Sequence, residues 1–436
     1  MKYDKIFRSN ADFLNLLRFY KGINKIELGK YLNLSMPTIY KTLDDLDDAG
    51  IVNKKELSVY EDYGTLCGIS IGSSLCKIVF LDMNFCVFSA TKFASYKKVM
   101  IRALENGGLK NDPLLSKCSS DESKNYIYFC TPDNFSILKD SLDIIFECIK
   151  TWHDDESFLN FLSIGISCTG VINEQNHTIV NGHLLEYLNN TPLSKLIYPN
   201  KQTYFTKKEI DIYLVQNANA AMIAEKIALY HTNSEFKNKK NIMALYLGGG
   251  IGAGLYFGKI YSGACGYSGE IGHIATPYFL KTNSSFDADT KSTDMLDARC
   301  TCGNKDCFEH RIRTDVFRKS HKDFCYMSSV SIADELKKDP EKQKAKLFGT
   351  YLGYMVNICT NLLNLDLIIF TGKFYKSMDI VMNDMVKVLD ENHLKFNQNA
   401  CDLLVSKQGP KSSAMGAAIY AYHMKYDLEL SWEYNI

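Results

Sequence analysis

The sequence carries no net charge and no long apolar run, and both absences narrow the range of partners. Lysine plus arginine and aspartate plus glutamate number 50 each, so the overall charge favours neither nucleic acid nor a membrane surface. No segment reaches the roughly 18 consecutive apolar residues of a membrane-spanning helix. The first residues, MKYDKIFRSNADF, lack the apolar core of a secretory signal. A DNA-binding surface would therefore have to arise from local patterning, and no membrane partner is expected.

What the chain does have is length and an ordinary globular composition. Its 436 residues, 46% hydrophobic and 23% charged, suffice for two or three packing units with a large core. Fourteen cysteines in a chain without an export signal predict reduced thiols and a cytoplasmic location. These cysteines are scattered, except for the tight group Cys300, Cys302 and Cys307.

Two short helix patterns occupy the start of the chain. Apolar side chains recur at helical spacing over residues 11–20. A second helix is predicted at Lys25–Leu32, with Ile26 and Leu28 facing inward. A tight turn follows at Asn33. The two segments are therefore expected to pack together through their apolar faces.

A longer helix completes the motif. It begins at Ser35, a favourable N-cap, and ends at Ala49, before Gly50, which suits a left-handed cap. An extended segment then begins. Two short helices with a tight turn, a longer helix and a strand strongly resemble the winged helix-turn-helix of bacterial regulators. Residues 1–62 are therefore predicted to form a winged helix-turn-helix DNA-binding domain, with the longer helix entering the major groove.

Charge within this region favours DNA contact at one end of the longer helix. Residues 1–43 hold eight lysines and arginines against three acids. Four aspartates crowd the far end of the helix, where phosphate contact would be repulsive. The predicted groove or backbone contacts are Ser35, Thr38, Tyr40 and Lys41. The alternative is a three-helix protein-interaction module, since few cations follow the helix to form a wing.

From residue 63 onward, β-rich runs alternate with helix patterns, as in α/β proteins. Strands are predicted at Leu66–Ile71, Lys77–Asp82, Phe85–Ala90, Phe161–Thr169, Ile242–Leu247 and Leu365–Phe370, and helices at Asn217–Tyr230 and Ala414–Met424. Residues 98–125 look like a polar excursion without an assigned role. The repeated order predicts a duplicated fold with two lobes, approximately 63–190 and 191–436, and a cleft between them.

A pattern spread over most of the chain is similar to one family. The stretch LYLGGGIGAGLYFGKIYSGACGYSGEIGHIATP (245–277), followed by CTCGNKDCFE (300–309), resembles the signature region of the ROK family (repressor, open reading frame, kinase). Upstream, CGISIGSSLCKIVFLD, IGISCTGVINEQ and VQNANAAMIAE match the family's successive blocks. The resemblance implies a two-lobed actin-like, ribonuclease-H-like fold of the ROK sugar-kinase type over residues 63–436. It also implies either a sugar kinase or a sugar-sensing repressor, and the repressors usually carry the winged helix.

The resemblance implies a structural zinc site. Cys300, Cys302 and Cys307 place three thiolates on one glycine-containing loop, which suits a tetrahedral metal. The family's fourth ligand corresponds to His273. Asp306 stands where the family usually has a glycine, and aspartate tolerates a left-handed backbone better than most residues. The alternatives are three reduced cysteines that bind nothing and Cys265 as a substitute ligand.

The resemblance also implies a sugar pocket. The family holds sugar hydroxyls with an Asn-Asp pair, with the Glu and His of GE-x-GH, and with a Glu after the last zinc cysteine. The matching residues are Asn217, Glu270, His273 and Glu309. Carboxylates and amides suit a polyol because they hold vicinal hydroxyls and are costly to bury unpaired. Either glutamate alone would fit a surface salt bridge, but together they favour a pocket.

Two catalytic features of the family's kinases are missing, so the chain is predicted not to be an enzyme. Ala218 replaces the general base of the Asn-Asp pair, and Ser70 replaces the hairpin aspartate that serves the ATP-bound metal. Lys373 replaces the second glycine of a third nucleotide block. Gly248, Gly249, Gly250 and Gly252 survive as a vestigial nucleotide loop. Such glycines can persist simply because they let two backbones pack closely.

These features together predict a sugar-responsive regulator of carbohydrate metabolism genes that represses transcription from operator DNA. The effector would be a monosaccharide or a sugar derivative. A homodimer or homotetramer would present paired recognition helices to an inverted repeat. Two alternatives stay open, namely an ATP-dependent sugar kinase of the glucokinase or N-acetylhexosamine kinase type, and a degenerate scaffold that binds DNA constitutively and no sugar.

Overall fold

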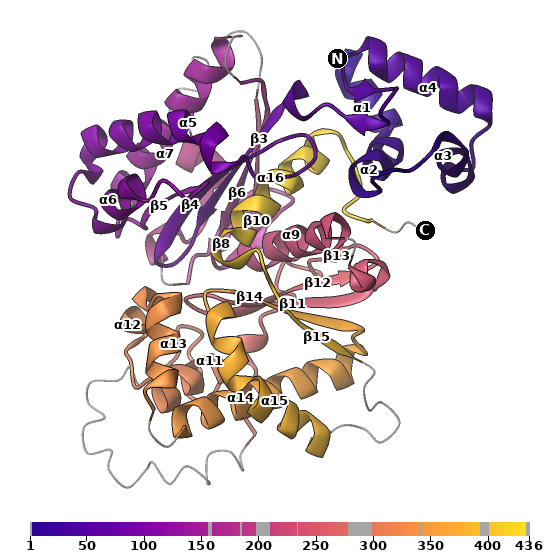
Figure 1. Cartoon of the computed structure of the whole chain (residues 1–436). Helices are drawn as coiled ribbons and strands as arrows, with labels where there is room; N and C mark the ends of the chain where they lie inside the picture. The colour runs from indigo at the N-terminus through magenta and orange to yellow at the C-terminus, as the bar shows by residue number, and fades with distance from the viewer. Residues whose placement is uncertain are drawn as a thin grey trace, which may run out of the picture.

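The structure, a computed structural model, places a small N-terminal unit beside two larger lobes (Figure 1). It describes residues 2–155, 159–183, 185–197, 210–232, 234–277, 299–339, 342–392 and 401–432. Over these ranges, no helix combines the length and the apolar character needed to cross a membrane.

The N-terminal unit consists of helices and a short hairpin. Its elements are α1 (Lys2–Ser9), α2 (Ala11–Phe19), α3 (Lys25–Leu32), α4 (Met36–Asp48), β1 (Val52–Asn53) and β2 (Ser58–Val59). As predicted, Ser35 caps α4 and Gly50 is left-handed, with φ 69°. The expectation for Ile26 is wrong. Its side chain is 74% exposed while Leu28 is fully buried, because residues two apart on a helix point in nearly opposite directions.

The upper lobe is built on a sheet with the strand order β10-β6-β3-β4-β5. The strands are β3 (Thr65–Ile71), β4 (Leu75–Leu81), β5 (Ile127–Cys130), β6 (Phe161–Cys168) and β10 (Asp211–Gln216). The first three in the order run parallel, and β4 and β5 pair antiparallel. Because β10 pairs with β6, this sheet extends past the lobe boundary near residue 190 that the sequence suggests.

Helices α5 (Ala90–Leu104), α6 (Pro113–Ser120) and α7 (Phe135–Asp154) lie together beside this sheet (Figure 1). The predicted strand at Phe85–Ala90 is wrong. Phe85 has a left-handed backbone with φ 61°, pairing is limited to an isolated bridge at Val87, and α5 starts at Ala90. Residues 98–125 contain the end of α5 and all of α6, because a few apolar side chains among many polar ones are enough to bury one helix face.

The lower lobe repeats the plan with the strand order β13-β12-β11-β14-β15. The strands are β11 (Asn241–Leu247), β12 (Ile251–Phe257), β13 (Ile260–Tyr261), β14 (Leu367–Gly372) and β15 (Asp402–Val405). The helices are α11 (Phe308–Arg311), α12 (His321–Tyr326), α13 (Ser329–Lys337), α14 (Gln343–Leu363) and α15 (Met378–Asn392). The predicted duplication is confirmed, since each sheet begins with an antiparallel meander and continues in parallel strands. A small third sheet holds β7 (Val171–Asn173), β8 (Thr178–Asn181) and β9 (Thr191–Pro192), followed by α8 (Leu193–Ile197).

Two helices, α9 (Asn217–His231) and α16 (Ser412–Lys425), lie between the sheets (Figure 1). They pack so closely that a Cβ added at Gly416 would lie 1.6 Å from the carbonyl oxygen of Ala220. A Cβ at Gly68 of β3 would likewise lie 1.9 Å from the carbonyl oxygen of Ala414 on α16. Glycine is required at both positions, and the contact fixes the two helices against each other and against the upper sheet.

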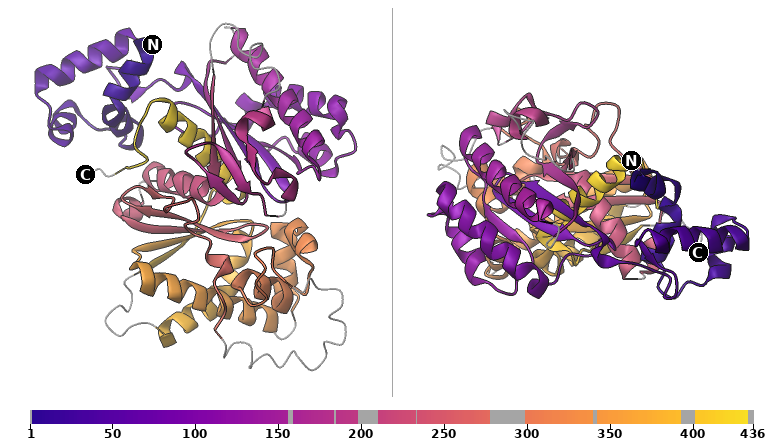
Figure 2. Two further views of the ribbon diagram at one scale, coloured as in Figure 1. Left: turned by 180° about the vertical axis from the view of Figure 1, so that it is seen from behind. Right: turned by 90° about the horizontal axis from the view of Figure 1, so that it is seen from above.

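Both central helices end beside the N-terminal unit, as two further views show (Figure 2). Phe19 of α2 stacks on Tyr230 near the end of α9, with ring centroids 5.1 Å apart. Phe7 of α1 meets Tyr422 of α16 edge to face at 5.9 Å. These buried aromatic contacts join the N-terminal unit to the core of the molecule.

Candidate functional site

A cavity of about 480 Å³ opens between the two lobes. Residues from both sheets line it, including the hairpin turn after β3 and the glycine loop between β11 and β12. The predicted sugar-binding residues Asn217, Glu270, His273 and Glu309 all lie in its wall. The fold therefore gathers these side chains from separate segments into one cavity, and a role for them in sugar binding stays a prediction.

Glu270 is the centre of a polar cluster in this cavity. Its Oε1 accepts a hydrogen bond of 2.9 Å from Nε2 of Gln216. Its Oε2 lies 3.8 Å from Nε2 of His183 and 3.7 Å from Nε2 of His273. Burial raises the pKa of Glu270 above its ordinary value, and the charge of Glu309 adds to the rise, against the opposing effects of His273 and Gln216. A ligand hydroxyl that donates to this carboxylate would lower the cost of its burial.

Glu309 is buried at the start of α11, and its carboxylate accounts for the glycine at position 250 in the loop between β11 and β12. Its Oε2 accepts a hydrogen bond of 2.8 Å from the backbone N–H of Ile251. A Cβ added at Gly250 would lie 2.6 Å from the same oxygen. The glycine therefore lets the carboxylate reach the loop backbone, so its presence here has a structural cause that is independent of nucleotide binding.

Hydroxyl groups behind the cavity wall surround Asn217. Ser70 donates to Oδ1 of Asn217 at 3.4 Å, and its Oγ lies 2.9 Å from Oγ of Ser413. Ala218 also lines the cavity, and a Cβ added at Gly252 would lie 3.7 Å from its methyl group. No carboxylate is present at position 70 or 218. Neither position therefore offers a carboxylate to a ligand hydroxyl or to a metal ion.

A candidate metal centre adjoins the cavity. One ligand atom from each of four residues lies within 4.8 Å of the others, and the residues are His273, Cys300, Cys302 and Cys307. Hydrogen bonding with Cys307 and burial raise the pKa of Cys300 to about 12, so its thiolate needs a cation to compensate it. Three sulfurs and one imidazole nitrogen form a donor set that fits a tetrahedral metal such as zinc. Cys265, considered as a substitute ligand, is exposed and lies outside this group.

His273 belongs to both clusters. Its Nδ1 lies 3.6 Å from Sγ of Cys300, and its Nε2 faces Glu270. With a metal on Nδ1, the proton of the neutral ring resides on Nε2, where it can donate to a carboxylate or to a ligand oxygen. The geometry of the metal centre would therefore fix the orientation of a polar group in the cavity wall.

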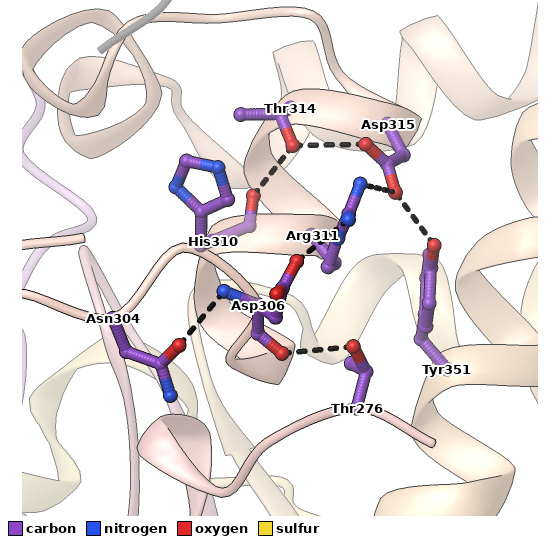
Figure 3. Close-up of polar contacts among 8 residues, drawn as sticks. All are labelled: Thr276, Asn304, Asp306, His310, Arg311, Thr314, Asp315 and Tyr351. Carbon is purple, nitrogen blue, oxygen red and sulfur yellow. Dashed lines mark hydrogen bonds and ion pairs between the residues drawn. The ribbon is translucent and has the colours of Figure 1, made fainter. Parts of the chain in front are cut away.

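Hydrogen bonds brace the cysteine loop from outside (Figure 3). The carbonyl oxygen of Asp306 accepts from the backbone N–H of Thr276 at 2.7 Å and from its hydroxyl at 2.8 Å. The carboxylate of Asp306 pairs with Arg311 at 2.7 Å. Asp306 does not need a left-handed backbone here, because the positive φ of this loop, 84°, falls at Gly303. The aspartate therefore serves as a brace rather than as a substitute for glycine.

Two residues of the cavity wall that contact Glu270 were not predicted. Gln216 ends β10 and immediately precedes Asn217, so its position next to a predicted ligand was an available signal. His183 follows β8 with φ 53° and its ring centroid lies 5.6 Å from that of His273. No local pattern marks His183, because only the tertiary fold brings it to Glu270.

The predicted DNA contacts occupy the N-cap and the first half of α4. Ser35, Thr38, Tyr40 and Lys41 are all exposed. The hydroxyls of Ser35 and Thr38 lie 2.8 Å apart, and Ser35 also caps the helix by accepting from the backbone N–H of Thr38. Nζ of Lys25 lies 4.8 Å from the centroid of the Tyr40 ring. The structure thus keeps these side chains on one accessible helix end, and contact with DNA stays a prediction.

The acidic far end of α4 has a structural role. Nζ of Lys54, in the turn between β1 and β2, lies 3.1 Å from Oδ1 of Asp44 and 3.5 Å from Oδ2 of Asp47. The backbone N–H of Lys54 also donates to Asp47 at 3.2 Å. These aspartates therefore anchor the hairpin to α4.

The fold and the cavity define a two-lobed α/β protein of the sugar-kinase-like class with a helical unit at its N-terminal side. The chain belongs to the ROK family, whose family model matches residues 132–423.

Curated relatives include repressors and kinases. The chain is 25% identical over 221 residues to a xylose repressor of Bacillus subtilis (strain 168), which covers 50% of this chain and 52% of the repressor. It is 25% identical over 191 residues to an N-acetyl-D-glucosamine kinase of Vibrio cholerae, which covers 43% of this chain and 60% of the kinase. The chain thus spans about half the length of the Bacillus subtilis relative that it matches.

Solved structures show the same fold over more of the chain. A ROK family transcriptional regulator, a homologue of the Escherichia coli MLC protein, aligns with a TM-score of 0.65 at 17% identity and covers 97% of each chain. A ROK family glucokinase from Streptomyces griseus aligns with a TM-score of 0.55 at 14% identity, covering 83% of this chain and 100% of the glucokinase. The regulator match includes the N-terminal unit, which fits the predicted combination of a DNA-binding domain with a ROK domain.

Proposed function

We propose that the protein is a sugar-responsive DNA-binding repressor in which residues 63–436 act as the sensor and residues 1–62 as the operator-binding domain. The proposal rests on one observation, namely that two helices connect the cavity directly to the N-terminal unit. Helices α9 and α16 each begin at or next to the cavity, at Asn217 and Ser412, and end in contact with the N-terminal unit. The similarity to xylose repressors and to a ROK transcriptional regulator supports the same function.

Closure of the lobes on a ligand would act through these two helices. Each helix is buried along most of its length. At Gly416 the two helix backbones are in direct contact, with no side chain between them. A displacement at their first turns is therefore transmitted as a rigid movement rather than absorbed locally. Because a ligand shifts an equilibrium only by its differential affinity for two states, the sugar must bind one lobe arrangement more tightly than the other.

A sugar kinase is the second candidate, because N-acetyl-D-glucosamine kinases are among the relatives. Ala218 and Ser70 weigh against it. A positioned general base contributes about 10²–10⁴-fold to a rate, and phosphoryl transfer also depends on a bound metal that neutralises charge. The protein would have lost both contributions, so we propose that it is not an enzyme.

The metal centre would hold zinc in a structural role. Its ligands would be His273, Cys300, Cys302 and Cys307, all protein groups, which leaves no open position for catalysis. Bound zinc would stabilise the thiolates and keep His273 turned toward Glu270. The metal would thereby fix one wall of the sugar site.

A dimer or tetramer would present two copies of α4 to an inverted repeat. The test is selection of bound duplexes from a random-sequence pool by the purified full-length protein, followed by titration of the selected duplex with a panel of sugars. The proposal expects an inverted repeat and a sugar that changes its affinity. A protein that selects no sequence, or that binds none of the duplexes, would not be an operator-binding regulator.

A further inference from the structure

The charged residues that line the cavity fall into an acidic group and a basic group. Two carboxylates of its wall, Glu270 and Glu309, lie with His183 and His273 near the metal centre. Lysines gather elsewhere in the wall, and they are Lys77, Lys117, Lys124, Lys373 and Lys376. The remaining acid of the wall, Asp121, lies 3.9 Å from Lys124 as an ion pair. A neutral sugar needs no such group of cations, so the wall is built for more than hydroxyl groups.

Lys77 is the decisive member of this group. Its side chain lies on β4 in the cavity wall, and the residue is 7% exposed. In the part of the chain that the structure describes, it has no hydrogen-bond or ion-pair partner. Because Lys77 lines the cavity without a counter-charge, its ammonium group is free to pair with an anion that enters there. An anion in the cavity would supply what Lys77 lacks.

The sheet register places Lys77 beside the residues that would hold the sugar. Lys77 is the direct antiparallel partner of Ser70, so their side chains stand on the same face of the sheet. Ser70 in turn donates to Asn217 at 3.4 Å. The neighbouring residue Ala218 is uncharged, so no carboxylate at these positions would repel an anion. The cation therefore lies within reach of a single small ligand that also contacts Asn217.

Other lysines extend the positive region across the cavity. Nζ of Lys373, after β14, donates to the carbonyl oxygen of Phe324 at 2.9 Å, which holds it in place in the wall. Lys376 is exposed at the rim, with Nζ 5.9 Å from the centroid of the Tyr375 ring. Lys411, before α16, lies close enough to Lys124 for their charges to interact. Ammonium groups around one cavity repel each other, and an anion bound between them would offset this repulsion.

From this geometry we infer that the effector is a phosphorylated sugar, with its hydroxyls toward Glu270 and Glu309 and its phosphate toward Lys77. The inference rests on the proposed function, in which the cavity is the sensor site. A phosphate carries two negative charges near neutral pH and accepts several charge-assisted hydrogen bonds, which are about twice as strong as neutral ones.

The test compares each free sugar with its phosphate ester by calorimetric titration of the full-length protein. The panel is glucose, N-acetylglucosamine and xylose with glucose 6-phosphate, N-acetylglucosamine 6-phosphate and xylose 5-phosphate, and inorganic phosphate and ADP as further probes. We expect at least one ester to bind about tenfold to hundredfold more tightly than its parent sugar. Equal affinity of ester and parent throughout, or tighter binding of ADP or inorganic phosphate than of every ester, would overturn the inference.

Two variants locate the phosphate. Lys77→Met should remove most of the preference for the ester while changing the affinity for the free sugar less than about threefold, since only the anionic contact is lost. Lys376→Gln, at the exposed rim, should lower the preference by a smaller factor without affecting folding. Lys98→Met, at an exposed position on α5, is the matched control. An unchanged preference in both cavity variants would refute the assignment.

A measurement of operator binding in the absence of ligand distinguishes a failure of this inference from a failure of the proposed function. A protein that binds the selected duplex but prefers no ester would retain the proposed function and refute the phosphate site. A protein that prefers an ester through Lys77 but binds no duplex would keep the site and refute the regulator.

Discussion

The guanidinium group of Arg18 on α2 donates a hydrogen bond of 3.0 Å from Nη2 to the hydroxyl of Tyr422 on α16. The same guanidinium donates to the carbonyl oxygen of Met83 at 2.7 Å and lies over the ring of Phe85 at 4.6 Å. Arg18 is only 4% exposed. One buried side chain thus ties the N-terminal unit both to the upper lobe and to the helix that starts beside the cavity.

Replacing Arg18 should uncouple the sensor from the DNA-binding domain. In an Arg18→Met variant we expect effector binding to stay within about twofold of wild type, because the cavity is untouched. The response of operator affinity to effector should fall several-fold. Removal of a buried charged hydrogen-bonding group also costs about 1–3 kcal/mol or more of stability, which chemical denaturation would measure.

Tyr422→Phe is the matched variant for this link. It removes the hydroxyl that accepts from Arg18 and keeps the ring that packs on Phe7 and Phe85. We expect a smaller loss of coupling than in Arg18→Met. If both variants respond to effector like the wild type, the contact between α2 and α16 does not carry the signal.

Lys41 should contribute to DNA affinity through phosphate contact rather than base recognition. We expect Lys41→Ala to weaken binding to the selected operator and to unrelated duplexes alike, and to reduce the salt dependence by about one counterion. Anisotropy titrations at several salt concentrations would measure both effects. Lys98→Ala, at an exposed position far along the chain, should change neither, and an unchanged salt slope in Lys41→Ala would place α4 outside the interface.

The four-ligand centre should bind one zinc ion per chain. Mass spectrometry of metal content should show this stoichiometry in the wild type and a clear loss in Cys307→Ser, whose sulfur is fully buried in the cluster. Chelation should lower the thermal midpoint, since a ligand that binds only the native state stabilises it. Cys265→Ser is the control, and loss of metal in that variant instead would show that the ligand set is different.

Much of the site could be predicted from the sequence, because residues that belong to one short motif also lie close together in the folded chain. The cysteine loop, Glu270 and Glu309 were predicted from short motifs, and the structure brings the two glutamates to one cavity and the cysteine loop beside it. Partners that come from distant segments left no such pattern. His183 reaches Glu270 only through the fold, and Lys77 is an ordinary strand residue until its register with Ser70 is known.

The same distinction holds for the fold. Strands that alternate with turns were predicted within a few residues, as for β3 and β6. The run at Phe85–Ala90 was apolar enough for a strand, but Phe85 adopts a left-handed backbone and α5 begins directly after it. Short apolar runs do not distinguish strand from turn or helix without tertiary contacts. The inward placement of Ile26 failed because Leu28 already occupies the buried face of the same helix.

Glu225 on α9 should make stability depend on pH. Its Oε1 accepts hydrogen bonds from Thr371 at 2.7 Å and Ser406 at 2.6 Å, and burial outweighs them and raises its pKa to about 7. The folded state therefore holds this proton more tightly than the unfolded state does. Its contribution to the free energy of unfolding is present at low pH and declines as pH rises from about 4.5 toward 7.

Glu225→Gln isolates this effect, because the amide cannot ionise. Relative to wild type, the variant should gain roughly 1–3 kcal/mol in unfolding free energy between pH 5 and pH 8, at about 1.4 kcal/mol per pKa unit. Denaturant titrations at the two pH values measure the difference. Glu235→Gln, at an exposed position, is the control, and a Glu225→Gln difference that does not vary with pH would contradict the prediction.

The central claim is that the protein is a sensor without kinase activity. The most direct test measures operator binding and ADP formation in the same sample. Full-length protein bound to a fluorescent selected operator is given ATP, magnesium and the best-binding sugar or sugar phosphate, while anisotropy and ADP are recorded together. We predict that the effector changes operator binding at least about tenfold, which corresponds to about 1.4 kcal/mol of coupling, and that no ADP forms above background. Steady ADP release on a sugar, or operator binding that no ligand alters, would contradict the account.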